Sequence, residues 1–422
     1  KNYKLGGTGI LMNAAEIGWG YDAPGTALKN IATAKRNWHF TATNVHDFMW
    51  AADPDYIHLV RKTPAGYPTI HVIYKNKIND PQADTAWNVV ADAAVTVLPF
   101  IEAQFGKYPY GQYSFIHGGD GGMEYPMATL LNNPGLGGVF HEWMHTWYQM
   151  MLATNEGMYP WMDEGFTTYS SDLVKNYYTQ KVSKVKGAGN ATYIKSLDSI
   201  AALLPLNHLD SYQSYYSLAK SGLEEPLTTH ADHYETNAAY GAAVYSKGCV
   251  FIEQLGYILG TSVRDKILLE YYKQWRFKHP NASDFIKLSE DVSGVKLDWY
   301  KEYWCGTTKK IDYSIDSLWE ENGTSMIRLR RIGLMPMPID LKLSFKDGTT
   351  EMHYVPLNLM FGEKPSEDKG QSHIVHEEWR WTSPTYIVSF KHRLLDLKKV
   401  EIDPTKRMAD VDSKNNTLLL NW

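Results

Sequence analysis

Residues 139–145 read V-F-H-E-W-M-H, and the pattern H-E-x-x-H inside them decides how the rest of the chain is interpreted. If this stretch is helical, His141 and His145 lie at positions i and i+4, one above the other on a single face of the helix. Two imidazoles placed in this way can share one metal ion, and Glu142 between them can reach the outer side of that ion. The pattern therefore predicts a helix that carries a metal site.

The sequence around this pattern favours a helix. Gly137 and Gly138 are expected to interrupt the chain just before it, and an apolar run continues from Val139 to Leu152. Five-letter patterns of this kind also occur by chance in structural helices. Taken alone, the stretch leaves a zinc-dependent hydrolase and a purely structural helix equally open.

The composition is that of an ordinary globular protein. The chain has 422 residues, which suggests about three domains at ~150 residues each. Its 42 Lys and Arg against 47 Asp and Glu give a net charge of −5, too small to favour nucleic acid or a polybasic membrane contact. No uninterrupted apolar run approaches the ~20 residues of a membrane span. Two cysteines, Cys249 and Cys305, cannot build a disulfide framework or a zinc–thiolate site, so histidines and carboxylates must hold any metal.

Changes in hydrophobic period divide the chain into three regions. Up to about residue 75 it reads as β-rich, with turn signals at residues 6–9 and 22–25 and strands at 38–43 and 69–74. A helical period then runs from Trp87 to Ile101, and mostly helical sequence covers residues 183–300. Past Gly306 the period returns to two. Strands are expected there at residues 339–345, 353–360, 377–382, 386–391, 398–403 and 417–422, which favours a β-sandwich.

A catalytic zinc site keeps three protein ligands and leaves one position for water. The helix predicted to begin at Pro160 offers a third ligand in Glu164. Eighteen residues lie between His145 and Glu164. That spacing allows one helix to end and a second to pack alongside. Asp163 is the competing candidate, and Glu164 could instead be a helix N-terminal acid stabilised by the macrodipole. Together with H-E-x-x-H, we favour Glu164 as the ligand.

These motifs resemble those of the gluzincin zinc aminopeptidases, the family of aminopeptidase N and the leukotriene-forming hydrolase. H-E-x-x-H, 18 residues and Glu164 within W-x-D-E-G-F are similar to its zinc motif. Residues 121–124 (GGME) resemble its G-x-M-E-N motif, and residues 245–248 (YSKG) resemble its Y-x-K-G element. Residues 45–48 (VHDF) resemble the junction between its N-terminal β domain and its catalytic domain. The matches occur in the family's order and cover about residues 38–305.

The resemblance implies an α+β multidomain fold. Residues 1–68 would be the C-terminal part of an N-terminal β domain, residues 69–305 a thermolysin-like zinc peptidase domain, and residues 306–422 a β-sandwich domain. The long helical-repeat domain of larger family members is not expected, because the tail is β-patterned. The chain begins at Lys1 without an initiator Met or a signal peptide, so we expect a processed or truncated piece.

The resemblance also implies a role for each motif residue, with His141, His145 and Glu164 holding one Zn²⁺ per chain. Glu142 would act as general base on the zinc-bound water and pass the proton to the leaving amine. Tyr245 could donate a hydrogen bond to the oxyanion, although with 29 tyrosines in the chain a core aromatic is the plain alternative.

Removal of a single N-terminal residue would depend on residues 121–124. Glu124 could pair with the α-ammonium of the substrate, whereas without the family it reads as a surface loop acid. The backbone of Gly121 and Gly122 could lie along the substrate as an added strand, and Met123 could line the first side-chain pocket. Tyr125 stands where the family usually has Asn, and the family's P-C-x-D-x-P stretch is absent, so this sequence departs from the family pattern at the amine pocket.

The expected function is a zinc-dependent aminopeptidase acting on peptides with a free N-terminus, without a nucleic acid partner or a membrane span. A zinc endopeptidase is one alternative, but thermolysin-type enzymes place the third ligand one residue further on and lack G-x-M-E. A catalytically inactive scaffold is another, and the intact set of motif residues argues against it. The sequence does not predict an oligomeric state. An exported or periplasmic location is slightly favoured over a cytoplasmic one.

Overall fold

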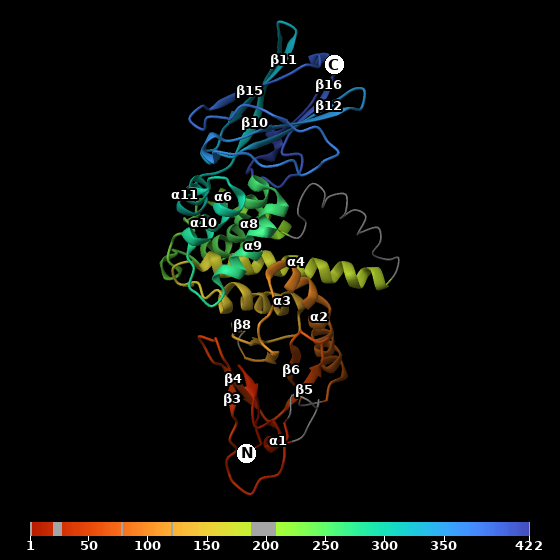
Figure 1. Cartoon of the computed structure of the whole chain (residues 1–422), viewed down its shortest axis with the longest axis vertical. Coiled ribbons are helices and arrows are strands. Elements are labelled where there is room, and N and C mark those ends of the chain that lie inside the picture. The colour runs from red at the N-terminus through yellow and green to blue at the C-terminus, as the bar shows by residue number, and fades with distance from the viewer. Residues whose placement is uncertain (1, 20–27, 77–78, 120, 187–207, 422) are drawn as a thin grey trace. The chain divides into compact units, whose positions relative to one another are not determined.

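The computed structural model describes residues 2–19, 28–76, 79–119, 121–186 and 208–421 (Figure 1). The chain divides into two compact units. Unit 1 comprises Lys1–Asn155, Phe166–Ala191 and Tyr271–Pro280, and unit 2 comprises Glu156–Gly165, Thr192–Glu270 and Asn281–Trp422. The turn predicted at residues 22–25 lies outside the described residues. The domain boundaries predicted after residues 68 and 305 stay predictions.

A five-stranded mixed sheet forms the frame of unit 1. Its order is β5–β6–β7–β9–β8, with β5 (Tyr56–Arg61), β6 (Thr69–Lys75), β7 (Gln112–His117), β8 (Gly122–Tyr125) and β9 (Ala128–Leu131). Strands β6, β7 and β9 run parallel, while β5 and β8 are antiparallel to their neighbours. The strand predicted at residues 69–74 is confirmed as β6. Strand β8, which the sequence did not indicate, forms one edge of the sheet.

Helices α2 (Pro81–Phe105) and α3 (Leu136–His145) supply aromatic side chains that contact strand residues of this sheet. The ring of Tyr74 stacks on Trp87 of α2 with the centroids 5.7 Å apart. The ring of Phe115 meets Trp143 of α3 edge-on at 5.2 Å. The Pro–Gln–Ala start of α2 is capped by Asp80, whose side chain accepts a hydrogen bond from the backbone N–H of Gln82. The helix predicted from apolar spacing is therefore confirmed.

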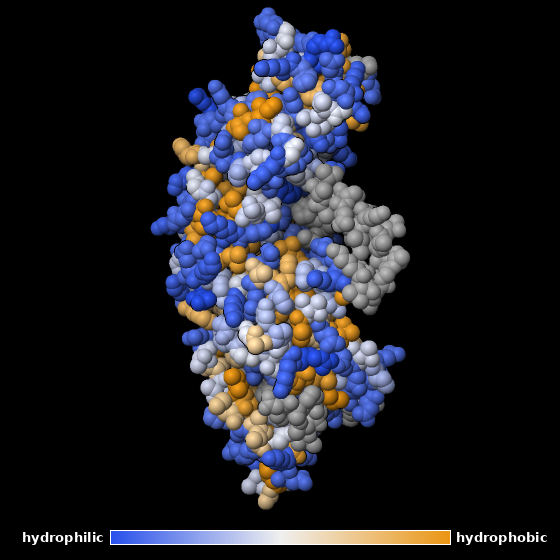
Figure 2. All heavy atoms as spheres, turned by 45° about the vertical axis from the view of Figure 1, so that its right-hand side comes forward, coloured by the Kyte–Doolittle hydropathy of each residue, from blue (hydrophilic) through white to orange (hydrophobic). Residues whose placement is uncertain are grey.

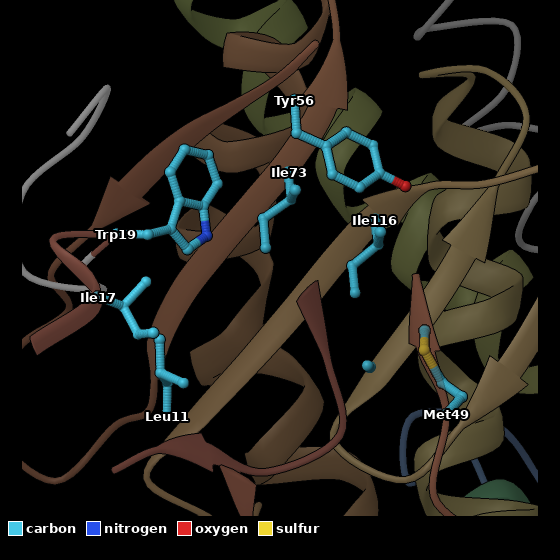
Figure 3. Close-up of a cluster of buried hydrophobic side chains, with 8 residues drawn as sticks. Leu11, Ile17, Trp19, Met49, Tyr56, Ile73 and Ile116 are labelled. Atoms are coloured by element: carbon cyan, nitrogen blue, oxygen red, sulfur yellow. The ribbon is translucent and has the colours of Figure 1, made fainter. Parts of the chain in front are cut away.

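N-terminal strands contribute a second core cluster with the same sheet. Strand β1 (Lys4–Gly7) pairs with β4 (Trp50–Asp53), and β2 (Ile10–Leu11), which precedes helix α1 (Ala14–Ile17), pairs with β3 (Phe40–Thr41). Figure 3 shows this cluster, which contains Leu11, Ile17, Trp19, Met49, Tyr56, Ile73, Ile116 and Ala128. The strand predicted at residues 38–43 is wrong in length, because its partner β2 is two residues long and Asn44 turns the chain with a positive φ of 54°.

Among the described residues, α2 is the one helix long and apolar enough to cross a membrane by length and composition. Its apolar stripe is buried and lies against β5 and β6. A core helix has the same hydropathy, so packing against the sheet accounts for the composition of α2. On the face drawn in Figure 2, the described residues present mainly hydrophilic side chains, with hydrophobic ones in small separate groups.

Unit 2 begins with a helical region centred on α8 (Gly248–Leu259), in which every residue is buried. This helix is hydrophobic on all sides, as expected of the middle of a core. Further helices here are α6 (Leu209–Ser221), α7 (Asn237–Gly241), the π-helix η5 (Ala242–Lys247), α10 (Ala282–Ser293) and α11 (Asp298–Gly306). Helix α9 (Thr261–Trp275) belongs to unit 2 up to Glu270 and to unit 1 from Tyr271. The described part of the predicted helical region confirms the prediction.

The C-terminal part of unit 2 is β-rich, as predicted, and consists of two sheets. The first has the order β10 (Tyr313–Glu321), β11 (Thr324–Arg331) and β15 (Thr385–Phe390). The second has the order β14 (Ile374–Val375), β13 (Thr350–Val355), β12 (Ile339–Phe345), β16 (Leu397–Ile402) and β17 (Thr417–Leu419). Strand β10 of the first sheet lies against β16 and β17 of the second.

One predicted strand in this region does not form. Residues 377–382 make only an isolated bridge between Trp379 and Leu357. Trp379 is buried, and its ring meets Tyr313 edge-on at 5.5 Å. The apolar pattern there comes from Trp379, whose side chain enters the core from a loop. The residues after it form a turn and do not pair with another strand.

Candidate active site

The pattern H-E-x-x-H lies on helix α3, as predicted, but the helix begins earlier than expected. Gly135 is its N-cap residue, so Gly137 and Gly138 form part of its first turn and do not precede it. The first N–H groups of a helix have no intrahelical partner, so glycines cost less there than in a helix interior. Directly after His145 the chain continues as a π-helix, η1 (Thr146–Met151), whose six residues are all buried.

The two histidines of α3 converge. The Nε2 atoms of His141 and His145 lie 3.2 Å apart, and the ring planes meet at 88°. In a tetrahedral site with Zn–N distances of about 2.05 Å, two ligand nitrogens lie roughly 3.4 Å apart. The spacing of the two nitrogens and the imidazole donor type therefore fit a zinc ion.

A threonine hydroxyl on helix α4 (Pro160–Lys186) contacts the other ring nitrogen of His145. The Oγ1 of Thr167 lies 3.2 Å from Nδ1 of His145, and both residues are buried. If Nδ1 carries the proton and donates a hydrogen bond to this hydroxyl, Nε2 keeps its lone pair for a metal. Thr167 was not singled out from the sequence. The available signal was its position three residues after Glu164, on the same side of the helix.

Strand β8 lies directly over Glu142. A Cβ atom added to Gly122 would lie 2.2 Å from Oε1 of Glu142 and 2.7 Å from its Cδ. Every other residue has a Cβ atom, so any substitution of Gly122 would displace the Glu142 carboxylate from this position. The glycine of this motif is therefore required by the position of the Glu142 carboxylate.

Glu124 lies on the same side of β8 as Gly122, since alternate residues of a strand share a face. Its Oε1 is 3.9 Å from Nδ1 of His145. Glu124, Glu142 and His145 each offer a ligand atom within 4.8 Å of the other two. Met123, between the two inward positions, is 40% exposed, and Gly121 before them has a φ of +46°. Two carboxylates thus lie close together beside a strand edge.

In unit 2, Glu164 and Tyr245 lie together. The hydroxyl of Tyr245 donates a hydrogen bond of 2.6 Å to Oε1 of Glu164. Burial and the neighbouring Glu164 carboxylate raise the pKa of Tyr245 well above its usual range, so the phenol keeps its proton and remains a donor. Tyr245 lies on the π-helix η5, and π-helical turns often occur at functional sites.

Two glycines allow the helices that carry these residues to touch. Gly165 follows Glu164 on α4, and Gly248 begins α8 directly after η5. A Cβ on Gly165 would lie 2.6 Å from the Cα of Gly248, and a Cβ on Gly248 would lie 2.9 Å from the Cα of Gly165. Backbone meets backbone here, which explains why both motifs contain glycine directly after the polar residue.

A family model described as the Peptidase family M1 domain matches residues 90–304, which is half of the chain. The chain belongs to peptidase family M1. The match contains α3, β8, α4 and η5, so every element described above as carrying a motif residue lies inside the M1 domain. The recognition of an aminopeptidase family from the sequence motifs is confirmed.

Relatives in the M1 family are aminopeptidases. Aminopeptidase B of Rattus norvegicus is 26% identical over 51% of this chain and 31% of its own length. Aminopeptidase M1-D of Oryza sativa subsp. japonica is 26% identical over 42% of this chain and 18% of its own length. The chain therefore spans a third or less of the length of these curated relatives.

One solved structure shares the fold over most of the chain. The crystal structure of Legionella pneumophila aminopeptidase A in complex with aspartic acid covers 96% of this chain and 42% of its own, with a TM-score of 0.57 and 12% identity. This likeness supports a multidomain α+β fold with β-rich regions.

Proposed function

We propose that this chain is the catalytic part of a zinc-dependent aminopeptidase, which removes the N-terminal residue of a peptide. Membership in peptidase family M1 and the aminopeptidases among its relatives support this class of activity. The observation that carries the proposal is the position of edge strand β8 over helix α3, with the Glu124 and Glu142 carboxylates beside the buried His145. This arrangement combines a metal-binding helix with a docking edge for an extended peptide.

In this proposal His141, His145 and Glu164 hold one Zn²⁺. The spacing of the two imidazole nitrogens and the orienting contact from Thr167 support the two histidines. Support for Glu164 comes from the continuity of α4, because Thr167 contacts His145 and lies one turn after Glu164. Residues three apart on a helix are neighbours on its surface, with Cβ atoms about 5–6 Å apart. When bound, the ion would polarise the peptide carbonyl and lower the pKa of water toward ~7.

Glu142 and Tyr245 would share the proton transfer and the charge stabilisation. The carboxylate of Glu142 accepts a proton from the attacking water and returns it to the leaving amine. Tyr245 remains protonated, so its hydroxyl can donate a hydrogen bond to the oxygen that becomes negatively charged. Its acceptor here, Glu164, is itself a proposed ligand.

The edge strand supplies a basis for exopeptidase selectivity. An extended peptide can add to the free edge of β8 through backbone hydrogen bonds, with Gly121 and Gly122 permitting close approach. Glu124 then attracts the α-ammonium group and limits how far the peptide extends past the reacting bond. Met123 is exposed enough to contact the first side chain and would accept apolar residues.

The test uses the chain of 422 residues, freed of metal and then reloaded with Zn²⁺. Peptides and amino-acid amides are offered with a free or an acetylated N-terminus, and bound metal is measured in parallel. We expect one zinc per chain and cleavage that requires both zinc and the free amine. Equal cleavage of acetylated peptides would favour an endopeptidase. A folded chain that binds no zinc would favour a scaffold.

A further inference from the structure

Lys247 shares the π-helix η5 with Tyr245 but is directed elsewhere. Residues two positions apart on a helix do not face each other. Tyr245 contacts Glu164, whereas the ammonium group of Lys247 contacts Glu224 and Thr307. Two residues of η5 thus have separate polar partners, one toward the motif residues of unit 2 and one away from them.

A buried ion cluster surrounds the Lys247 ammonium. Its Nζ lies 2.9 Å from Oε1 of Glu224 and donates a hydrogen bond of 3.3 Å to the carbonyl of Thr307. The other carboxylate oxygen of Glu224 binds Nζ of Lys310. Trp304 covers the group, with its ring centroid 5.6 Å from the ammonium and its Nε1–H donated to the Lys247 carbonyl at 3.3 Å.

Burying these charged groups costs free energy, because they lose their hydration. The side chains of Lys247 and Glu224 are 2% and 3% exposed, and burial lowers the pKa of Lys247 to about 8. Two ammonium groups also share one carboxylate. Apolar side chains of similar volume would stabilise such a position as well or better, so the gain from a buried ion pair is often a fixed geometry.

The geometry that the cluster fixes is the rotation of η5 about its own axis. Contact between Gly165 and Gly248 sets the distance between α4 and the helix that continues from η5. Neither glycine has a side chain to interlock, so this backbone contact does not by itself hold η5 at one angle. The ion pair of Lys247 with Glu224 and its hydrogen bond to the Thr307 carbonyl hold the side of η5 that does not face Glu164.

We propose that Lys247, held by Glu224, is a positioning residue that sets the rotation of η5 and thereby directs the hydroxyl of Tyr245. The inference rests on the proposed function, in which Tyr245 donates to the developing oxyanion. It adds a role for the Lys of the Y-S-K-G sequence and for Glu224, a residue outside every motif.

A double-mutant cycle on the zinc-loaded chain tests the inference. Tyr245→Phe should lower kcat by roughly 100-fold or more, as loss of an oxyanion donor does. Lys247→Met should lower kcat by about 10-fold or more with KM within about two-fold, because a misdirected donor acts in the transition state. The double variant should be no slower than Tyr245→Phe alone. The inference would be overturned if the double variant lost kcat by the product of the two single losses, or if kcat were unchanged in Lys247→Met.

A second buried lysine supplies the matched control. The Lys364 side chain is 3% exposed and its Nζ lies 2.5 Å from Asp340 and 3.0 Å from the carbonyl of Tyr257. Lys364→Met should lower Tm about as much as Lys247→Met and leave kcat unchanged. Equal loss of kcat in both variants would show a general effect of stability and contradict the inference.

Hydrogen exchange gives a readout independent of activity. In the zinc-free chain, amides of residues 242–248 should exchange faster in Lys247→Met than in the wild type, and at the wild-type rate in Lys364→Met. Unchanged exchange in Lys247→Met would contradict the inference. Glu224→Gln keeps the size of the partner and carries the same tests if Lys247→Met does not fold. Full activity of Tyr245→Phe would instead refute the proposed role of Tyr245, separately from the exchange result.

Discussion

Gly122 lies so close to Glu142 that one added methyl group changes the catalytic geometry. The Cβ of Gly122→Ala would lie 2.2 Å from Oε1 of Glu142, so the carboxylate has to move. Because a displacement near 1 Å can cost about 100-fold, kcat should fall by roughly that factor while zinc stays bound. Steady-state kinetics and metal analysis on the same samples measure both. In Gly138→Ala on α3, the added Cβ meets no atom of the described residues within 4 Å beyond its own stretch of helix, so this variant should keep its activity.

Substitutions of Glu142 and Glu164 should have different effects: the first should lower kcat and the second should lower zinc affinity. Glu142→Gln keeps the shape of the side chain but cannot accept a proton, so kcat should fall by roughly 10³-fold or more with zinc retained. Glu164→Ala removes a proposed ligand, so zinc affinity itself should fall. Competition with a chelator measures affinity in both variants. Substantial activity in zinc-loaded Glu142→Gln would mean that another group serves as the base.

Thr167 can be tested against its neighbour. Thr167→Val is isosteric and removes the oxygen 3.2 Å from Nδ1 of His145, so zinc affinity should fall about 10- to 100-fold, as for other groups that orient a ligand. Thr168→Val is the matched control, because the Thr168 hydroxyl has no hydrogen-bond partner among the described residues. Equal zinc affinity in the wild type and both variants would remove Thr167 from the site.

Motif spacing predicted which helix carries His141 and His145, and family resemblance supplied a role for Glu124 and Tyr245. Neither indicated that Gly122 is required by Glu142 or that Thr167 and not Thr168 contacts His145. Adjacent threonines look alike in the sequence, and only the rotation of α4 decides which hydroxyl faces the histidine. Contacts of this kind depend on packing between elements distant in the chain.

At the scale of elements, two glycines control how close α4 and α8 approach. Gly248→Ala would bring its Cβ within 2.9 Å of the Cα of Gly165, and backbone on both sides leaves no flexible side chain to yield. We expect a loss of about 1–3 kcal/mol in the free energy of unfolding, typical of overpacking. Denaturant titration measures it. In Gly241→Ala on α7, the added Cβ meets no atom within 4 Å in the part of the chain that the structure describes, outside its own stretch of helix, so this variant should be neutral or slightly stabilising. Equal losses in both variants would mean that the loss does not come from crowding.

Hydrophobic period predicted long elements well and irregular ones poorly. Strand β12 alternates cleanly in the sequence and forms over the predicted residues. The hairpin of β10 and β11 was missed, because a bulge between Ile315 and Ser317 shifts the alternation by one residue. The π-helices η1 and η5 have no signature in an apolar period of 3.6, so the sequence predicted continuous helices there.

At the scale of the whole molecule, buried carboxylates should make stability depend on pH. Burial raises the pKa of Asp410 to about 6 from its ordinary 3.8. The folded state therefore binds more protons than the unfolded state between these values, and stability is lost as pH rises through 6. In Asp410→Asn the side chain cannot ionise. Its free energy of unfolding relative to that of the wild type should therefore increase by about 1.4 kcal/mol from pH 5 to pH 8; a constant difference would contradict this.

Three regions of different period were predicted from the sequence, and the β-rich C-terminal region and the helical region before it are confirmed. The division into two packing units was not predicted, because both units are assembled from segments distant in the chain. Unit 1 takes residues 166–191 and 271–280 from the middle of the sequence, and no local pattern indicates such long-range contacts.

Because η5 is a π-helix, the directions of Tyr245 and Lys247 depend on the number of residues in this segment. A π-helical turn holds one residue more than the α-helical turn it replaces. Deleting a single alanine from residues 242–243 would let the segment return to α-helical geometry without touching Tyr245, Lys247 or Gly248. The phenol and the ammonium would then turn together by about 100°, one residue's rotation in a helix of 3.6 residues per turn. Single-residue insertions and deletions in this region should therefore be as damaging as substitution of Tyr245 itself.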